Sequence, residues 1–135
     1  MTREEWKELT ESKVVFLDGA TGSNLLKRGM PAGVCPEKWI LENEEVLIGL
    51  QREFIQAGAD ILYAPTFTGN RIKLKEYGLE DEIAEINQRL AALSKEAVRR
   101  EQEAGLKRKV FVAGDLTMTG QQLYPIGTMQ FEELI

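Results

Sequence analysis

The chain has 135 residues, 43% of them hydrophobic, and its 17 basic and 22 acidic side chains give a net charge of −5. Because phosphate binding depends on clustered positive charge, this balance argues against a nucleic-acid partner or an anionic membrane surface. No stretch approaches the roughly 20 apolar residues of a membrane span, and the polar first residues lack the apolar core of a secretory signal, so we expect a globular cytoplasmic protein.

The first third of the chain predicts one helix, one strand and a long loop. Thr2 and Glu5 have the spacing of a capping box, which predicts a short helix over residues 3–10. Residues 14–17 form a continuous apolar run that is β-branched at its start, which is typical of a strand buried on both faces. Residues 23–42 contain two glycines and two prolines, and these helix breakers predict a long connecting loop.

The middle of the chain alternates helix and strand. Asn43 precedes two glutamates and marks a helix start, after which Val46, Leu50 and Phe54 recur on one face until Gly58 ends the helix. Residues 61–64 then predict a second strand.

A long helix and a third strand follow. The apolar stripe that begins at Ile83 and the outward pairs Glu85 with Arg89 and Glu96 with Arg100 predict a helix of about 20 residues. Residues 110–113 form the third strand, and a further helix begins at 131.

The three predicted strands are separated by about 45–50 residues, and each runs into a small polar cluster. This order is typical of parallel βα units with their functional loops after the strands. A complete (β/α)8 TIM barrel needs about 250 residues, so we expect residues 1–135 to be one domain, the N-terminal portion of such a barrel with about three units. Two strand edges and one sheet face would then be uncovered, which predicts self-association or pairing with the missing barrel part.

The cluster after the first strand is Asp18-Gly19-Ala20-Thr21-Gly22. Its glycines let backbone N–H groups approach a carboxylate or phosphate, although a tight turn capped by Asp18 explains the same pattern. The cluster matches neither the dinucleotide-binding nor the P-loop motif.

The clusters after the second and third strands offer groups that orient a ligand. Thr66, Thr68 and Asn70 are short polar side chains suited to this role. Asp115 has three possible roles, those of a general base, a partner for a cation and a loop cap. Without histidine, no Ser-His-Asp or Cys-His set is available, and we assign no catalytic residue.

Four motifs in this order resemble the homocysteine S-methyltransferase family, which includes cobalamin-dependent methionine synthase and its betaine-dependent relatives. The resemblance spans nearly the whole chain and is carried by residues 16–22 (FLDGATG), 51–62 (QREFIQAGADIL), 66–74 (TFTGNRIKL) and 113–120 (AGDLTMTG). One departure concerns the position before Thr66, which is often Asn in cobalamin-dependent members and is Pro65 here.

The resemblance implies a (β/α)8 barrel that binds homocysteine at the C-terminal ends of its strands. It implies a zinc ion on three cysteines that lie beyond residue 135, and methyl transfer to the zinc-activated thiolate to give methionine, with methylcobalamin, methyltetrahydrofolate or a similar donor on a corrinoid or folate module. This chain alone is then expected to be inactive and to hold no metal. The residues that the resemblance places in homocysteine binding are Asp18, Gly19, Ala20, Thr21, Thr66, Asn70 and Asp115.

Two other functions stay open at this stage. The chain fits a non-catalytic amino-acid-binding module, which would hold a carboxylate without chemistry. It also fits a fragment of a phosphosugar-type barrel lyase or isomerase that uses Asp18 and Asp115 as acid and base, with a phosphate site from later loops.

Overall fold

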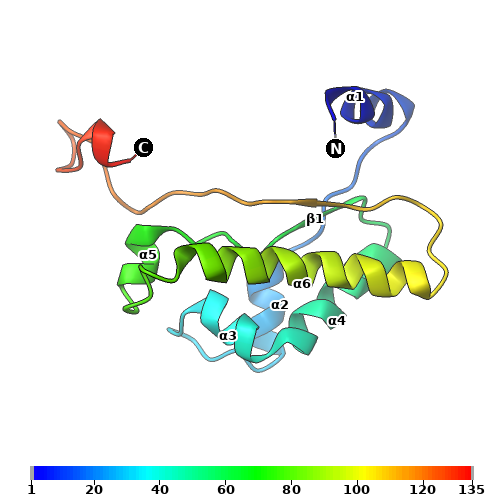
Figure 1. The fold of residues 1–135 in the computed structure, drawn as a ribbon, viewed down its shortest axis with the longest axis horizontal. Helices are drawn as coiled ribbons and strands as arrows, with labels where there is room; N and C mark the ends of the chain where they lie inside the picture. The colour runs from blue at the N-terminus through cyan, green and yellow to red at the C-terminus, as the bar shows by residue number, and fades with distance from the viewer. Residues whose placement is uncertain (1, 135) are drawn as a thin grey trace.

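A computed structural model describes residues 2–134 of the chain (Figure 1). Its helices and strands are, in chain order, α1 (Arg3–Ser12), α2 (Thr21–Lys27), α3 (Pro36–Glu42), α4 (Glu44–Gln56), β1 (Ile61–Tyr63), α5 (Arg71–Lys75), α6 (Ile83–Glu103), β2 (Phe111–Ala113) and the 3-10 turn η1 (Phe131–Glu133). None of the described helices is both long enough and apolar enough to cross a membrane.

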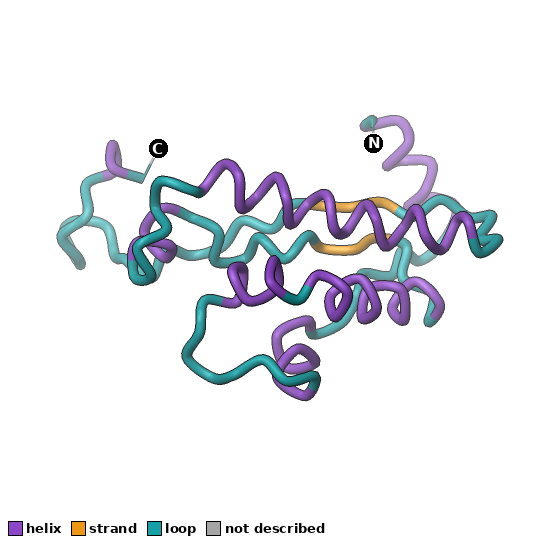
Figure 2. The backbone as a smooth tube through the Cα atoms, turned by 60° about the horizontal axis from the view of Figure 1, so that its bottom comes forward, coloured by secondary structure: helices purple, strands orange, loops and turns teal. Residues whose placement is uncertain are grey.

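The strands are parallel, as predicted. β1 pairs with β2 so that Leu62 lies opposite Val112. Helix α4, which precedes β1, and helix α6, which lies between β1 and β2, pack against each other and against the sheet (Figure 2). This is the arrangement of successive right-handed βα units, in which both helices cover the same face.

The prediction for residues 14–17 is wrong in two respects. This segment joins the sheet through a single bridge, Leu17 to Ile61, instead of forming a regular strand. Val14 is 73% exposed and Phe16 61% exposed, so the segment is not buried on both faces. The reason is that α4 and α6 cover one face of the sheet, while the opposite face has no covering element among the described residues.

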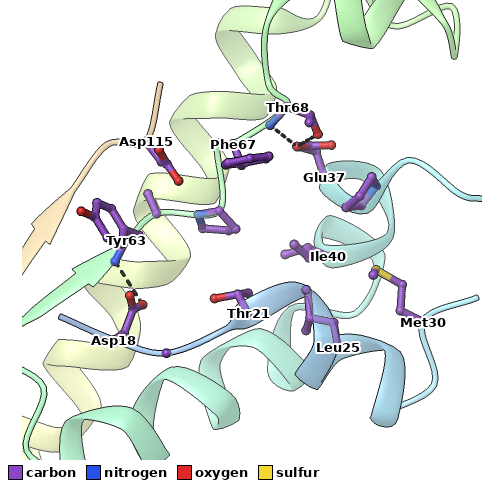
Figure 3. Close-up of a pocket in the computed structure, with 15 residues that line it drawn as sticks. Asp18, Thr21, Leu25, Met30, Glu37, Ile40, Tyr63, Phe67, Thr68 and Asp115 are labelled. Atoms are coloured by element: carbon purple, nitrogen blue, oxygen red, sulfur yellow. Dashed lines mark hydrogen bonds between the residues drawn. The ribbon is translucent and has the colours of Figure 1, made fainter. Parts of the chain in front are cut away.

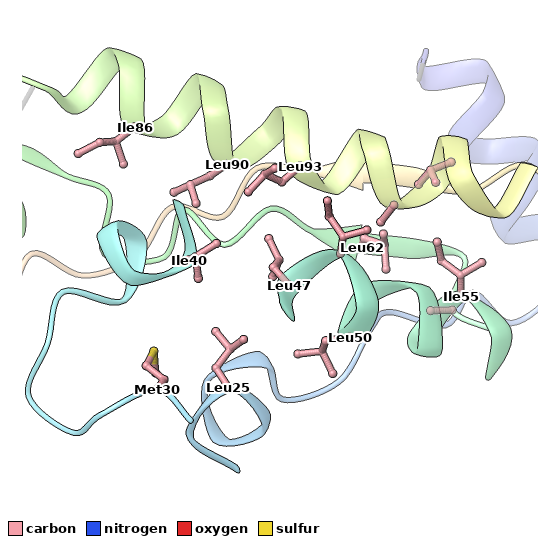
Figure 4. Packing of buried hydrophobic residues seen from close by; sticks show 14 of the residues in the cluster. Leu25, Met30, Ile40, Leu47, Leu50, Ile55, Leu62, Ile86, Leu90 and Leu93 are labelled. Atoms are coloured by element: carbon pink, nitrogen blue, oxygen red, sulfur yellow. The ribbon is translucent and has the colours of Figure 1, made fainter. Parts of the chain in front are cut away.

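The core lies between the sheet and the two long helices (Figure 4). Leu47 and Leu50 of α4, Leu62 of β1 and Leu90 of α6 are fully buried there. Leu25 of α2 and Ile40 of α3 extend the same cluster. The region predicted as a long loop therefore contains two short helices, because each buries one apolar side chain, α2 against α4 and α3 against both α4 and α6.

The helix predictions are otherwise confirmed. Thr2 and Glu5 form the capping box of α1, and the outward pairs of α6 are present, with 4.0 Å between Arg89 Nη1 and Glu85 Oε1 and 2.8 Å between Arg100 Nε and Glu96 Oε1. After β2 the chain runs extended past one end of α6 and reaches η1 (Figure 1). The predicted helix at 131 is in this structure one 3-10 turn.

The buried carboxylate of Asp60 and two partly exposed cations join three segments at the N-terminal end of the strands. The carboxylate of Asp60 accepts a hydrogen bond from the Phe16 N–H at 3.1 Å and lies 2.5 Å from Lys13 Nζ and 3.3 Å from Arg108 Nη1. The Arg108 guanidinium also donates to the Ile55 and Ala59 carbonyls at the end of α4. These contacts fix the register of the segment around Phe16 relative to β1.

Candidate active site pocket

A cavity of about 520 Å³ opens at the C-terminal ends of the strands (Figure 3). Its walls come from the turn after Leu17, from α2 and α3, and from the loops that follow β1 and β2. Three carboxylates, those of Asp18, Glu37 and Asp115, line it together with apolar side chains such as those of Leu25 and Phe67. No lysine or arginine is among the described lining residues. The cavity therefore favours a ligand with a cationic group.

Asp18 stands where the first segment leaves the sheet. Its Oδ2 accepts the backbone N–H of Tyr63 at 3.1 Å. Burial raises the pKa of Asp18 to about 6, and the nearby charge of Asp115 adds to this effect, while the N–H groups of Tyr63 and of Asp18 itself act in the opposite direction. The carboxylate is ionised at neutral pH but protonates in mild acid.

Gly19 is needed because the Phe54 ring of α4 comes close to its backbone. A Cβ atom at this position would lie 2.9 Å from Phe54 Cε1, closer than real Cβ atoms approach a neighbour. The glycine therefore lets the turn lie flat on α4 beside the cavity.

Thr66 ties the ends of the two strands together. Its hydroxyl donates to the Asp115 carbonyl at 2.9 Å and accepts the Asp115 N–H at 3.0 Å. The Thr66 side chain thereby fixes the backbone that carries the Asp115 carboxylate. Thr66 therefore supports the cavity wall without lining the cavity itself.

The predicted site residues separate into two groups. Asp18, Gly19, Thr21 and Asp115 line the cavity together, whereas Ala20, Thr66 and Asn70 are not among its lining residues. Asn70 Oδ1 accepts the Lys73 N–H at 3.0 Å and so caps α5, while its Nδ2 is buried without a partner in the described part of the chain. The substrate-binding role of all seven residues stays a prediction.

Sequence reasoning missed Glu37. This side chain is 2% exposed, and its Oε1 accepts both the N–H and the hydroxyl of Thr68, at 3.0 and 2.5 Å. The contact ties α3 to the loop after β1, and the Phe67 ring of this loop lies beside it at the cavity (Figure 3). A glutamate just after Pro36 is typical of an exposed first helical turn, so the sequence carried no signal for this role.

Sequence reasoning also missed Gln51. Its side chain is fully buried in α4, and its Nε2 donates to the Tyr63 carbonyl at 3.0 Å. A signal was present, because this glutamine stands on the apolar face of the predicted helix, next to Leu47 and Leu50 in the sequence pattern.

The described residues do not fit a zinc ion. Within residues 2–134 no group of three histidine, cysteine or acidic side chains has metal-binding geometry. Cys35 is buried, and its Sγ lies 3.5 Å from Glu37 Oε2. Burial raises the pKa of this thiol, and the Glu37 charge adds to the shift, so Cys35 is a protonated thiol at neutral pH.

Parallel βα units with a ligand cavity at the C-terminal ends of the strands define the chain as part of a (β/α) barrel protein. The family model of homocysteine S-methyltransferase matches residues 15–135, and the chain belongs to this family.

Solved structures agree with the fold. The homocysteine methyltransferase MmuM from Escherichia coli in its metallated form has a TM-score of 0.72 and 19% sequence identity, over 82% of this chain and 40% of that chain. The oxidized form of MmuM gives a TM-score of 0.67 at the same identity and coverage. The predicted partial barrel is thus confirmed, and the chain spans well under half the length of these structures.

Proposed function

We propose that this chain forms the homocysteine-binding part of an enzyme that transfers a methyl group to the homocysteine sulfur, giving methionine. The observation that supports this most directly is the pair of carboxylates, Asp18 and Asp115, at a cavity whose described lining residues include no lysine or arginine. An amino acid carries an ammonium group at neutral pH, and charge-assisted hydrogen bonds to carboxylates are roughly twice as strong as neutral ones.

In the proposed complex the ammonium group of homocysteine lies between Asp18 and Asp115. The backbone of Gly19, Ala20 and Thr21 faces its carboxylate, and the apolar wall formed by Leu25 and Phe67 accepts its methylene groups. The methyl group then moves from its donor to the thiolate, so that a sulfur–carbon bond forms as the donor–carbon bond breaks. The described residues hold the amino-acid end and supply no base for the thiol.

The remaining requirements belong to parts of the enzyme outside these residues. We propose zinc on cysteines beyond residue 135, and a methyl donor such as methylcobalamin or methyltetrahydrofolate on a corrinoid or folate module. We also propose a cytoplasmic location. The alternative of a phosphosugar enzyme, with Asp18 and Asp115 as acid and base, needs a phosphate site from later loops, and no lysine or arginine among the described lining residues of this cavity supplies one.

Calorimetric titration of the chain with three thiols tests this proposal. We expect L-homocysteine and 3-aminopropane-1-thiol, which lacks the carboxylate, to bind more tightly than 4-sulfanylbutanoate, which lacks the amino group. The affinity for 4-sulfanylbutanoate should be at least about 10-fold lower than that for L-homocysteine, because this compound leaves the carboxylates without a cation. Equal binding of 4-sulfanylbutanoate, or tighter binding of inorganic phosphate, would contradict the proposal.

The open face of the sheet leads to a second expectation, self-association of the isolated chain or pairing with the rest of the barrel. Val14 and Phe16 are exposed there, and the outer edge of β2 has no partner strand in the described part of the chain. Static light scattering on the purified chain should give a mass above the monomer value of 15.2 kDa. A monodisperse monomer with cooperative unfolding would contradict this expectation.

A further inference from the structure

β1 pairs on one edge with the segment around residues 14–18. At the C-terminal end of this edge, two side chains make the hydrogen bonds in place of the backbone. Three backbone hydrogen bonds join these segments. The Phe16 carbonyl accepts from the Asp60 N–H at 2.7 Å and the Ile61 N–H at 3.2 Å, and the Ile61 carbonyl accepts from the Asp18 N–H at 3.0 Å. In a regular parallel pair the next bonds would join the Tyr63 N–H and carbonyl to the backbone of the neighbouring segment. Here Asp18 Oδ2 accepts from the N–H, and Gln51 Nε2 donates to the carbonyl.

Because these two side-chain hydrogen bonds replace backbone ones, the chain leaves the sheet at Asp18. Both backbone groups of Tyr63 on this edge are satisfied without the backbone of residues 19–20, so the turn is free to bend beside the cavity and α2 begins at Thr21. Without the Gln51 amide, the nearest alternative donor along this edge is the backbone of the turn itself. Pairing of that backbone with Tyr63 would extend the ladder and pull the Asp18 carboxylate out of its hydrogen bond.

The buried Gln51 amide lowers the stability of the core. It is buried with Leu47, Leu50 and Ile55 of α4, and its Oε1 has no partner in the described part of the chain. Figure 4 shows these three apolar side chains in the core. A buried polar atom that lacks a partner destabilises a fold, and an apolar side chain of similar shape would avoid the loss. The amide is therefore explained by its Nε2 contact and not by packing.

We propose that Gln51 is a positioning residue that holds the Asp18 carboxylate at the cavity wall by occupying the Tyr63 carbonyl. What Asp18 binds there rests on the proposed function, but the placement of its carboxylate does not. Helix α4 thus contributes to the ligand site through Gln51, although Gln51 is not among the residues that line the cavity.

NMR on the variant Gln51→Met tests this inference, because methionine keeps the size of the side chain and removes the donor. In the unchanged chain, the Tyr63 amide proton shift should follow the titration of Asp18, with a midpoint near pH 6. In Gln51→Met we expect the Tyr63 amide to lose this titration and homocysteine affinity to fall about 10-fold, the size of one lost positioning contact.

The matched control is Gln56→Met on the same helix. The Gln56 amide donates to Glu101 at 3.0 Å, away from the cavity, so its loss should leave the Tyr63 titration and homocysteine affinity unchanged. A folded Gln51→Met chain with an unchanged Tyr63 titration would overturn the proposal. If homocysteine fails to bind the unchanged chain while Gln51→Met still abolishes the titration, the proposed function fails and the positioning role stands.

A measurement without any substitution covers the case in which Gln51→Met does not fold. In the unchanged chain the Gln51 side-chain amide protons should exchange slowly with solvent and show a nuclear Overhauser contact with the backbone at Tyr63. Fast exchange together with no such contact would refute the assignment.

Discussion

Replacement of Asp18 by asparagine should reduce homocysteine affinity about 100-fold, as expected when a ligand ammonium loses a charged partner in a partly buried site. Asparagine keeps the shape of the side chain, and its Oδ1 can still accept the Tyr63 N–H, so the turn should stay in place. Calorimetric titration of Asp18→Asn and of the unchanged chain measures the difference. An affinity within about threefold of the unchanged chain would show that Asp18 does not hold the ligand.

The pH dependence gives an independent check of the same residue. Because the pKa of Asp18 is raised to about 6, the carboxylate protonates below that pH, and homocysteine affinity should fall about 10-fold for each further pH unit. Asp18→Asn should remove this dependence. Asp81→Asn is the matched control, since Asp81 is exposed and is not among the residues that line the cavity, and it should leave the profile unchanged.

Ionisation of Asp18 should have opposite effects on binding and on stability: it raises homocysteine affinity but lowers the free energy of unfolding. The native state binds the Asp18 proton more tightly than the unfolded state, in which the carboxyl titrates near pH 4. The contribution of Asp18 to stability is therefore greatest below pH 4 and decreases as the pH rises to about 6. At pH 7 Asp18→Asn should unfold at the same or a higher denaturant concentration, which separates lost binding from lost folding.

The sequence predicted those elements whose signals are local. The capping box of Thr2 and Glu5 and the apolar stripes of α4 and α6 depend on neighbours within one or two turns. Asp18 and Asp115 were found because the C-terminal ends of parallel strands meet at one edge of a sheet. The correct order of strands and helices was enough to predict that these two residues lie at one cavity.

The features that escaped prediction depend on distant contacts. α2 and α3 are short, and the roles of Leu25 and Ile40 depend on the surface that α4 and α6 supply for them to pack on. Glu37 acquires its role from Thr68, and Gln51 from Tyr63, across separations of 31 and 12 residues. Residues 14–17 have the composition of a strand. How many of them pair with β1 depends on distant elements that cover the sheet and on the side chains that take the place of backbone hydrogen bonds.

Replacement of Asp60 by alanine should lower the free energy of unfolding by about 2–3 kcal/mol, the usual effect of losing a buried charged hydrogen-bond partner whose cations, Lys13 and Arg108, stay partly in contact with solvent. The Asp60 side chain is 3% exposed, and its loss would leave Lys13 and Arg108 without their shared carboxylate and the Phe16 N–H without an acceptor. Urea denaturation followed by circular dichroism measures the change. Glu44→Ala is the control, because Glu44 pairs with Arg89 on the surface and should contribute less than about 1 kcal/mol.

Acid titration of the unchanged chain separates the charge of Asp60 from its packing. Burial raises the pKa of Asp60, but the Lys13 ammonium, the Phe16 N–H and the Arg108 guanidinium outweigh burial and hold the pKa below its usual value. A lowered native pKa means that this stabilisation is complete above the unfolded value of about 4 and is lost as the pH falls through the native pKa. Asp60→Ala should therefore be weaker than the unchanged chain at pH 7 and should approach it in acid. A constant difference in stability between pH 7 and pH 2.5 would show that Asp60 acts through packing alone.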